Sequence, residues 1–314
     1  MPYLQFGFVC LAWSISFLLM KKAALVFSPA DIALGRVVGG AAILALLWAW
    51  KERRWGLRRN DWLPLLIVVV AGCAWPYFIQ PWVIKKQGSA FMALMVSFVP
   101  LLTIGCSLLF LRVRPSVRQG IGVLGALVCL AVLMQDGLRR DVPWEHFALA
   151  ISVPMGYAIA NTVIRGWLSH VSALLLTGVS FALTSVVVAP FALSGTRPEA
   201  QPSDVWLAWS SLAFLALVGT GIATFVFNHL VRRHGPLFAG MTTNVVPLGA
   251  IFWGWFDHEP ISAAQCGAML GILAMVSLVQ FRAAQRHAPQ SSTTAADPKD
   301  DERRKDGVDS ESGD

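Results

Sequence analysis

The chain has 314 residues, of which 56% are hydrophobic and 14% are charged, and its net charge is +7. Soluble domains carry roughly 25% charged residues, so this composition excludes an ordinary soluble protein and indicates an all-α membrane protein. The positive charge does not indicate a nucleic-acid partner. The basic residues cluster at the ends of apolar segments, where they orient a chain in a lipid bilayer.

Apolar segments of about 18–24 residues recur along the chain, a length that crosses a hydrocarbon core of roughly 30 Å at about 1.5 Å per residue. The third and fourth of these, and likewise the eighth and ninth, are joined only by the short basic links KKQG and RRHG, which predict antiparallel neighbours. The start, MPYLQ, has no positive n-region, so we expect no cleaved signal peptide. We predict ten transmembrane helices, at residues 3–20, 32–50, 62–84, 88–111, 117–134, 145–164, 172–193, 206–231, 235–256 and 262–281.

The first two predicted spans each contain a residue that is unusual at its depth. Trp13 lies midway along the first span, where a large ring suits either helix packing or contact with a solute. Arg36 is the only charged residue that lies deeper than the first two residues of a predicted span, about 6 Å from its beginning. Charges at that depth are costly and are usually paired or functional. Arg36 therefore either extends to the outer interface or binds an anionic group such as a carboxylate.

Rings and amides also stand within later spans. The third span carries Trp75, Tyr77 and Gln80. The sixth carries Tyr157 and Asn161, one turn apart, so that both can face one cavity. Aromatic rings combined with a few amides suit a flat or amphipathic solute.

The inner end of the eighth span carries Asn228 and His229. A histidine titrates near neutral pH, although a single histidine is more often a hydrogen-bonding partner. We include both residues among the candidates for a substrate cavity.

Prolines stand at matching places in the fourth and ninth spans, Pro100 and Pro247. A proline removes one backbone hydrogen bond and bends a helix, and in lipid the freed carbonyl needs another partner. Three residues earlier each span has a polar side chain, Ser97 or Asn244, on nearly the same face. We predict that both faces line a central water-accessible cavity and that the prolines are hinges. The alternative is that Asn244 hydrogen-bonds a neighbouring helix.

The chain matches itself at an offset of 147 residues without a gap over about fifty residues. Val99-Pro100-Leu101 meets Val246-Pro247-Leu248, and Lys85-Lys86 meets Arg232-Arg233. The same offset pairs Gly72 with Gly219, Phe78 with Phe225, Gly88 with Gly235, Phe91 with Phe238 and Gly120 with Gly267. An offset of 144 pairs Trp13 with Tyr157, Lys21 with Arg165 and Ser28 with Ser172. We predict two halves, residues 1–137 and 143–283. Each has five spans, so the second copy enters the membrane from the opposite side, as in secondary transporters.

The distribution of lysine and arginine predicts the orientation. If the N-terminus is inside, the inner segments hold 17 of the 25 basic residues and the outer segments hold 7, which favours cytoplasmic termini. Lys21 and Lys22, directly after the first span, favour the opposite orientation. The polar stretch 284–314 has almost no apolar content and is predicted to be a disordered cytoplasmic tail.

The order of these features resembles a ten-helix drug/metabolite transporter of the EamA-like kind, over about 280 residues. The resemblance rests on Trp13 with Lys21, on Arg36, and on the stretch GPLFAGMTTNVVPLGAIFWGWFDHEPISAAQCGAMLGI. The first half departs from the family pattern, because FLRVRPSVRQG has no carboxylate where an acidic turn is often found. We therefore expect Glu259 to cap or anchor a helix end. The resemblance implies an inner-membrane exporter of amino acids or related compounds.

Other classes of protein fit the sequence less well. A membrane-embedded enzyme would need a nucleophile–base pair or metal ligands at depth, and the sequence offers no paired His/Asp cluster and no HExxH motif. The five cysteines lie in apolar segments without metal-ligand spacing, so packing explains them, and we expect no metal or cofactor.

No Asp or Glu lies in mid-span, which leaves facilitated exchange or an unidentified proton route as the coupling mode. A non-transporting scaffold or receptor stays open. So does a homodimer, because the small face of Gly35, Gly39 and Gly40 suits internal packing equally well.

Overall fold

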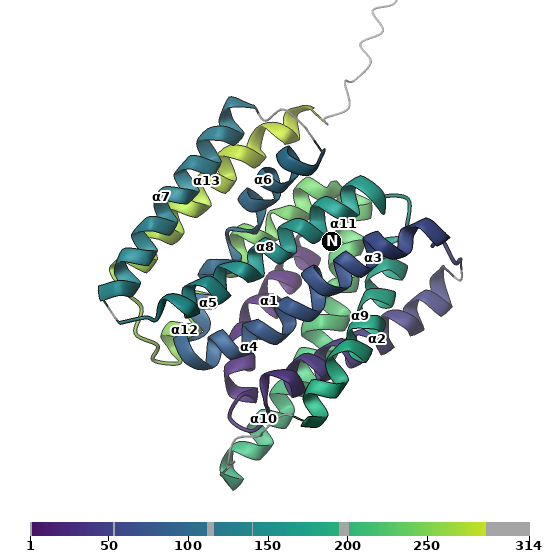
Figure 1. Ribbon diagram of the computed structural model, residues 1–314, viewed down its shortest axis with the longest axis horizontal. Coiled ribbons are helices and arrows are strands. Elements are labelled where there is room, and N and C mark those ends of the chain that lie inside the picture. The colour runs from purple at the N-terminus through teal and green to yellow at the C-terminus, as the bar shows by residue number, and fades with distance from the viewer. Residues whose placement is uncertain (1, 53, 112–115, 140, 195–200, 287–314) are drawn as a thin grey trace, which may run out of the picture. The chain divides into compact units, whose positions relative to one another are not determined.

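The computed structural model describes residues 2–52, 54–111, 116–139, 141–194 and 201–286, and this part of the chain is helical without strands (Figure 1). The predicted tail lies outside the described residues beyond position 286. Residues up to 280 form one compact unit, and the fold described below belongs to that unit.

The first half of the chain contains α1 (Pro2–Ala23), α2 (Pro29–Lys51), η1 (Arg59–Asp61), α3 (Trp62–Ile67), η2 (Val68–Ala74), α4 (Trp75–Gln87), α5 (Ser89–Val96), α6 (Val99–Leu111) and α7 (Val117–Arg139). The second half contains α8 (Trp144–Trp167), α9 (Ala173–Ser194), α10 (Pro202–Phe214), η3 (Leu215–Ile222), α11 (Ala223–Gly240), α12 (Thr242–Phe256) and α13 (Ala263–Arg286). η1 is a 3₁₀ turn, whereas η2 and η3 are π-helical and continuous with their neighbours.

Seven helices in the described residues are long and apolar enough to cross a membrane, and three shorter apolar helices, Gly120–Asp136, Val245–Phe256 and Ala263–Leu278, accompany them. The chain is therefore a multi-pass membrane protein. Its ten predicted spans correspond to these seven long and three shorter helices. A count of ten crossings stays a prediction.

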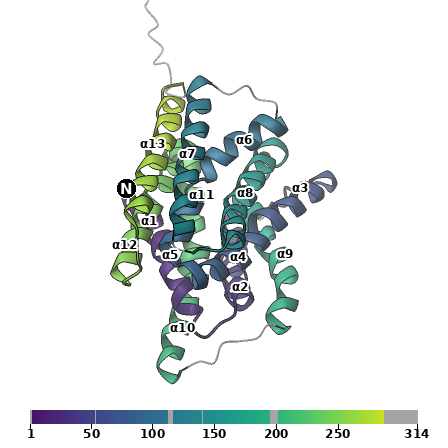
Figure 2. The same ribbon diagram turned by 60° about the vertical axis from the view of Figure 1, so that its left-hand side comes forward.

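The two halves pack in exchanged pairs (Figures 1 and 2). α1 packs on α12 while its counterpart α8 packs on α6, and α1 packs on α11 while α8 packs on α4. α2 lies directly against α9, its own counterpart. Such an exchange of partners is the contact pattern of two copies related by a two-fold axis.

The π-helical segments repeat this relation at the level of single residues. η2 and η3 begin at the same point of the 147-residue offset. In η2, a Cβ added to Gly72 would lie 2.6 Å from Ala160 of α8, and in η3 one added to Gly219 would lie 2.6 Å from Ser16 of α1. Only glycine permits these approaches, so each half brings its π-helical segment against the opening helix of the other half.

The small face of α2 is used inside the fold. A Cβ added to Gly35, Gly39 or Gly40 would lie within 3 Å of Leu212, Ala216 or Thr220 respectively, on α10 and η3. These glycines therefore serve internal packing.

The fourth span is interrupted where the sequence predicted a bend. α5 ends at Val96, two turn residues follow, and Pro100 is the second residue of α6. The first N–H groups of a helix have no helical partner, so Pro100 loses no hydrogen bond at that position.

The ninth span differs from this prediction. α11 continues through the RRHG link, so this link is not a loop, and the break falls at Met241 instead of before Gly235. α12 then runs without interruption through Pro247, which is an interior residue. The two prolines are therefore not equivalent in the backbone, because Pro100 stands at the start of a helix and Pro247 stands inside one. That the two prolines are hinges stays a prediction.

Candidate functional site

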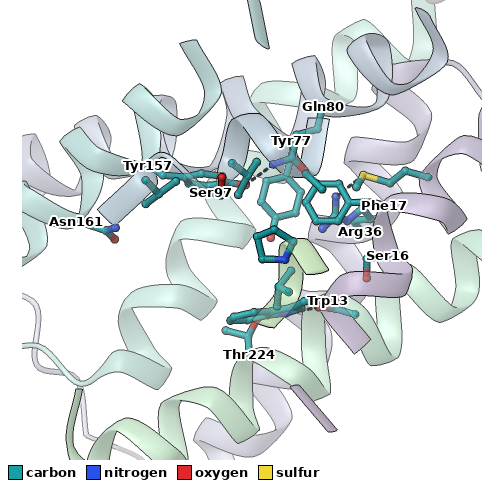
Figure 3. Close-up of a pocket in the computed structure, with 17 residues that line it drawn as sticks. Trp13, Ser16, Phe17, Arg36, Tyr77, Gln80, Ser97, Tyr157, Asn161 and Thr224 are labelled. Carbon is teal, nitrogen blue, oxygen red and sulfur yellow. Dashed lines mark hydrogen bonds between the residues drawn. The ribbon is translucent and has the colours of Figure 1, made fainter. Parts of the chain in front are cut away.

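A cavity of about 310 Å³ lies within the compact unit, where helices of both halves meet (Figure 3). Its walls are mostly apolar and include four aromatic rings. The lining residues are Trp13, Ser16, Phe17, Met20, Arg36, Tyr77, Gln80, Ala93, Val96, Ser97, Val99, Tyr157, Asn161, Gly219, Thr224, Val246 and Pro247.

The lining follows the internal repeat. The offset of 144 residues pairs Trp13 with Tyr157 and Phe17 with Asn161, and all four residues line the cavity. The offset of 147 pairs Tyr77 with Thr224 and Val99 with Val246, which also line it. The cavity is therefore built from equivalent positions of both halves.

Arg36 lies inside this cavity and not at the surface. The residue is only 7% exposed. Its Nε–H donates to Thr220 Oγ1 (3.3 Å), an Nη1–H donates to Met20 Sδ (3.0 Å), and Cζ lies 4.4 Å from the centre of the Tyr77 ring. Of the two alternatives for Arg36, extension to the outer interface does not agree with this burial, and Arg36 is a buried cation held by neutral groups.

Two hydrogen bonds of lining residues join the halves. Gln80 Nε2–H donates to the Tyr157 hydroxyl (2.9 Å), and Trp13 Nε1–H donates to the Gly219 carbonyl (3.1 Å). Trp13 also packs on Phe227, with ring centres 5.0 Å apart. Figure 3 shows Trp13 and Thr224 on one side of the cavity, with Tyr157, Ser97 and Gln80 on the other. These contacts fix the rings against which a ligand would lie.

The two ends of the cavity differ in character. Arg36 stands beside Tyr77 at one end in Figure 3, and Asn161 stands at the other. Asn161 is exposed, so the cavity reaches the protein surface at that end. Ser97 is buried, and its hydroxyl donates to the Leu94 carbonyl (2.6 Å) within its own helix. The side chain of Asn244 lies outside the described residues.

Three residues that the sequence singled out do not line this cavity. Trp75 is 42% exposed and donates its Nε1–H to Ser152 Oγ (2.8 Å). Asn228 and His229 line a separate cavity of about 330 Å³ with Lys51, Glu52, Leu174 and Phe225. There Asn228 Nδ2 is buried and has no hydrogen-bond partner among the described residues. The hinge candidate Pro100 also lies off the main cavity, whereas Pro247 lines it.

Sequence reasoning missed several lining residues that the repeat would have identified. Phe17 and Thr224 carry no polar signal at depth that distinguishes them, yet each is the repeat counterpart of a residue that was selected, Asn161 and Tyr77. Applying the two offsets to every candidate would have placed both in the lining. Met20, which contacts the Arg36 guanidinium, had no comparable signal.

Four charged residues form what we call the ion-pair cluster, Lys21, Lys22, Asp257 and Glu259. Lys21 Nζ lies 2.7 Å from Asp257 Oδ2 and 2.8 Å from Glu259 Oε1, and Lys22 pairs with Asp257 Oδ1. The cluster joins the end of α1, in the first half, to the connection between α12 and α13, in the second.

Glu259 also caps α5. Its carboxylate accepts from Ser89 N–H (2.9 Å), Ser89 Oγ–H (3.0 Å) and Ala90 N–H (3.0 Å), where an anion favours a helix N-terminus. This confirms that Glu259 anchors a helix end. Burial alone would raise the pKa of Glu259, but the Ala90 N–H and Lys21 together hold this pKa below its usual range. Burial and the two lysines act on Asp257 in the same way, and its pKa is also lowered.

Within the described residues, no group of three or more His, Cys, Asp or Glu side chains could hold a metal ion. The lining of the cavity offers one charge, four rings and several hydrogen-bonding groups.

Comparison with known proteins agrees with this architecture. The model of the EamA-like transporter family matches residues 2–135 and again residues 146–280. An uncharacterized transporter of Synechocystis is 23% identical over 298 residues, covering 86% of this chain and 87% of that protein. An S-adenosylmethionine/S-adenosylhomocysteine transporter of Chlamydia muridarum is 23% identical over 256 residues, covering 77% and 80%. One crystal structure of a protein shares the fold, with a TM-score of 0.62 at 18% identity over 90% of this chain and 98% of that chain.

Proposed function

Because the chain belongs to the EamA-like transporter family, we propose that it is a secondary transporter that exports small organic metabolites, amino acids or related compounds, across the inner membrane. The two matches to the family model support a mechanism in which two inverted halves, residues 1–137 and 143–283, rock about the shared cavity. Inverted copies can exchange conformations, which makes inward-open and outward-open forms close in energy.

The observation that carries the proposal is the position of Arg36. A buried guanidinium without a carboxylate partner is expensive in a membrane protein. Such a residue is retained where it binds an anionic group, and its planar fork suits a substrate carboxylate. Arg36 lies in a cavity lined by equivalent positions of both halves, which is where an alternating-access transporter holds its substrate.

The proposed orientation, with both termini cytoplasmic, assigns a direction to the structure. Arg165, near the end of α8, would then face the cytoplasm, and the exposed Asn161 would open the cavity to that side. The ion-pair cluster would close the outer end, and outward opening would require it to separate. The absence of a mid-span carboxylate in the sequence favours exchange over a buried carboxylate proton relay.

Reconstituted liposomes test this function directly. We expect purified protein to move labelled amino acids, their deaminated acids, or both, down a gradient, and Arg36→Gln to reduce the flux at least tenfold. S-adenosylmethionine and S-adenosylhomocysteine form a further arm, because two relatives carry those names. If the folded protein moves none of these solutes, the export proposal fails, and a scaffold, a receptor or a membrane-embedded enzyme takes its place.

A further inference from the structure

The described lining of the cavity carries a single full charge, the guanidinium of Arg36. Every other lining residue is neutral, and the sequence has no acidic residue in mid-span that could supply a negative charge. The acidic residues that pair with the end of α1, Asp257 and Glu259, bind Lys21 and Lys22. The cavity is therefore an electropositive site in a low-dielectric surrounding.

The groups that hold Arg36 leave part of its fork available. Thr220 Oγ1 receives the Nε–H, and Met20 Sδ receives one Nη1–H. Tyr77 contacts the guanidinium through its ring face, an attraction that stabilises a cation without neutralising it. Among the described residues, Nη2 has no hydrogen-bond partner. A carboxylate can therefore approach the Nη1 and Nη2 side in the bidentate geometry that guanidinium favours.

We propose, as a refinement that rests on the function proposed above, that the site selects aromatic monocarboxylates without a free ammonium group over the corresponding amino acids. The carboxylate binds Arg36, and the ring lies in the apolar part of the cavity. Charge selects the substrate, since the site offers one positive group and no negative group.

The ring has partners of the right kind. Trp13, Tyr77 and Tyr157 line the cavity, and the hydrogen bonds of Trp13 with Gly219 and of Tyr157 with Gln80 hold two of these rings in place. Aromatic pairs in stacked or edge-on geometry add stabilisation beyond the burial of area. A cavity of about 310 Å³ is at the small end for ligand sites, which suits one ring with a short chain.

An ammonium group finds poor partners in the same cavity. The Tyr157 hydroxyl already accepts from Gln80, and Ser97 and Ser16 direct their hydroxyl protons to the carbonyls of Leu94 and Ala12 in their own helices. Only neutral oxygen atoms and ring faces remain for it. In an amino acid the ammonium also stands beside the carboxylate, so binding brings it close to Arg36, and like charges repel strongly in a low-dielectric site.

Three probes that share a ring and chain length separate these charges. 3-Phenylpropionate carries only the carboxylate, L-phenylalanine carries both groups, and 2-phenylethylamine carries only the ammonium. We expect titration calorimetry on the detergent-solubilised protein at pH 7 to give at least tenfold tighter binding of 3-phenylpropionate than of phenylalanine, and no binding of the amine. The acid should also raise the apparent unfolding temperature, because it binds the folded state.

Variants assign the preference to Arg36. We expect Arg36→Gln to weaken 3-phenylpropionate binding at least tenfold while changing phenylalanine binding less, so that the preference disappears. Arg36→Lys keeps the charge without the fork and should keep the preference for the acid at lower affinity. Arg165→Gln, which removes one exposed positive charge from α8, is the matched control and should bind as the wild type does.

The outcomes separate this inference from the proposed function. Equal binding of phenylalanine and 3-phenylpropionate, or no binding of the acid by folded wild type, overturns the inference. Liposomes that transport phenylalanine while ignoring the acid also overturn it and leave the transport function intact. Selective binding of the acid without any flux would support the inference and refute the transport function.

Discussion

Gly88 has an unusual backbone conformation and lies next to Glu259, the residue that caps α5. Its φ is +92°, a conformation that costs other residues roughly 1 kcal/mol or more. A Cβ at this position would lie 2.9 Å from Glu259 Oε2. Both the strain and the displaced carboxylate act on the same cap.

We therefore expect Gly88→Ala to lower the free energy of unfolding by about 2 kcal/mol, from backbone strain and weakened hydrogen bonds to Glu259. Thermal unfolding in detergent measures this as a lower midpoint. Gly105→Ala is the matched control, because Gly105 lies within α6 and a Cβ there meets no atom within 4 Å. Equal midpoints for the two variants would show that Gly88 carries no strain.

Sequence reasoning selected lining residues most reliably where a polar or aromatic group stands deep within an apolar span. Arg36, Tyr77, Gln80 and Tyr157 are rare groups within apolar spans, and they meet in one cavity. Trp75 had the same signal, yet it lies outside. Trp75 and Tyr77 both belong to α4, and residues two apart in an α-helix do not share a face. Trp75 therefore points away from the cavity that Tyr77 and Gln80 line, which the helical period alone would have predicted.

Substitution of the two prolines should have different effects on stability, because the prolines occupy different positions in their helices. Pro100 lies in the first turn of α6, where its missing N–H costs nothing. Pro247 lies within α12, where a proline forgoes a helical hydrogen bond. Pro247→Ala should therefore raise the free energy of unfolding by about 1 kcal/mol, less than the full helix propensity difference because a buried ring is lost. Pro100→Ala should leave it nearly unchanged.

Transport gives the second readout for these variants. If the prolines allow the fourth and ninth spans to flex, the Pro100→Ala, Pro247→Ala double variant should transport several-fold more slowly while remaining folded. Flux equal to that of the wild type would remove the hinge role. A thermal midpoint that falls for Pro247→Ala would instead show that ring packing outweighs the restored bond.

Whether a helix ends at a glycine depends here on a distant residue that can cap the helix that follows. Gly88 and Gly235 are repeat counterparts, but the chain breaks only at Gly88. Glu259 supplies the cap at that break. The residue equivalent to Glu259 in the first half is Arg112, which offers no carboxylate for a cap after Gly235. The sequence shows that the first half has no carboxylate at this position. Only the structure shows that the helix of the second half therefore continues through Gly235.

The internal repeat was the most informative feature of the sequence, because it relates helix packing and cavity lining in the two halves as well as their sequences. The offsets found in the sequence reappear in the exchanged helix pairs, in the two π-helical segments and in the cavity lining. The symmetry is incomplete where charge is concerned. The offset of 144 pairs Arg36 with Ser180, which is neutral. The ion-pair cluster joins α1 to the connection between α12 and α13, and it has no counterpart among the described residues. These groups therefore distinguish the two halves.

The ion-pair cluster should make the stability of the whole unit depend on pH. The pKa values of Asp257 and Glu259 are lower in the folded chain than in the unfolded chain, so the folded state favours their ionised forms. Their contribution is complete above the unfolded values, about 4, and is lost as the pH falls through the lower folded values. We expect about 2 kcal/mol to be lost between pH 7 and pH 3, because the unfolded chain takes up protons on these two carboxylates at a higher pH than the folded chain does.

Thermal unfolding of detergent-solubilised protein at a series of pH values tests this, since the wild-type midpoint should fall below about pH 4. The Asp257→Asn, Glu259→Gln double variant should begin lower at pH 7 and change less on acidification. Glu145→Gln, at an exposed carboxylate on α8, should keep the full wild-type pH dependence. Parallel curves for the double variant and the wild type would mean that the cluster does not fasten the two halves. In that case α1 would have to be held against α12 and α5 by packing alone.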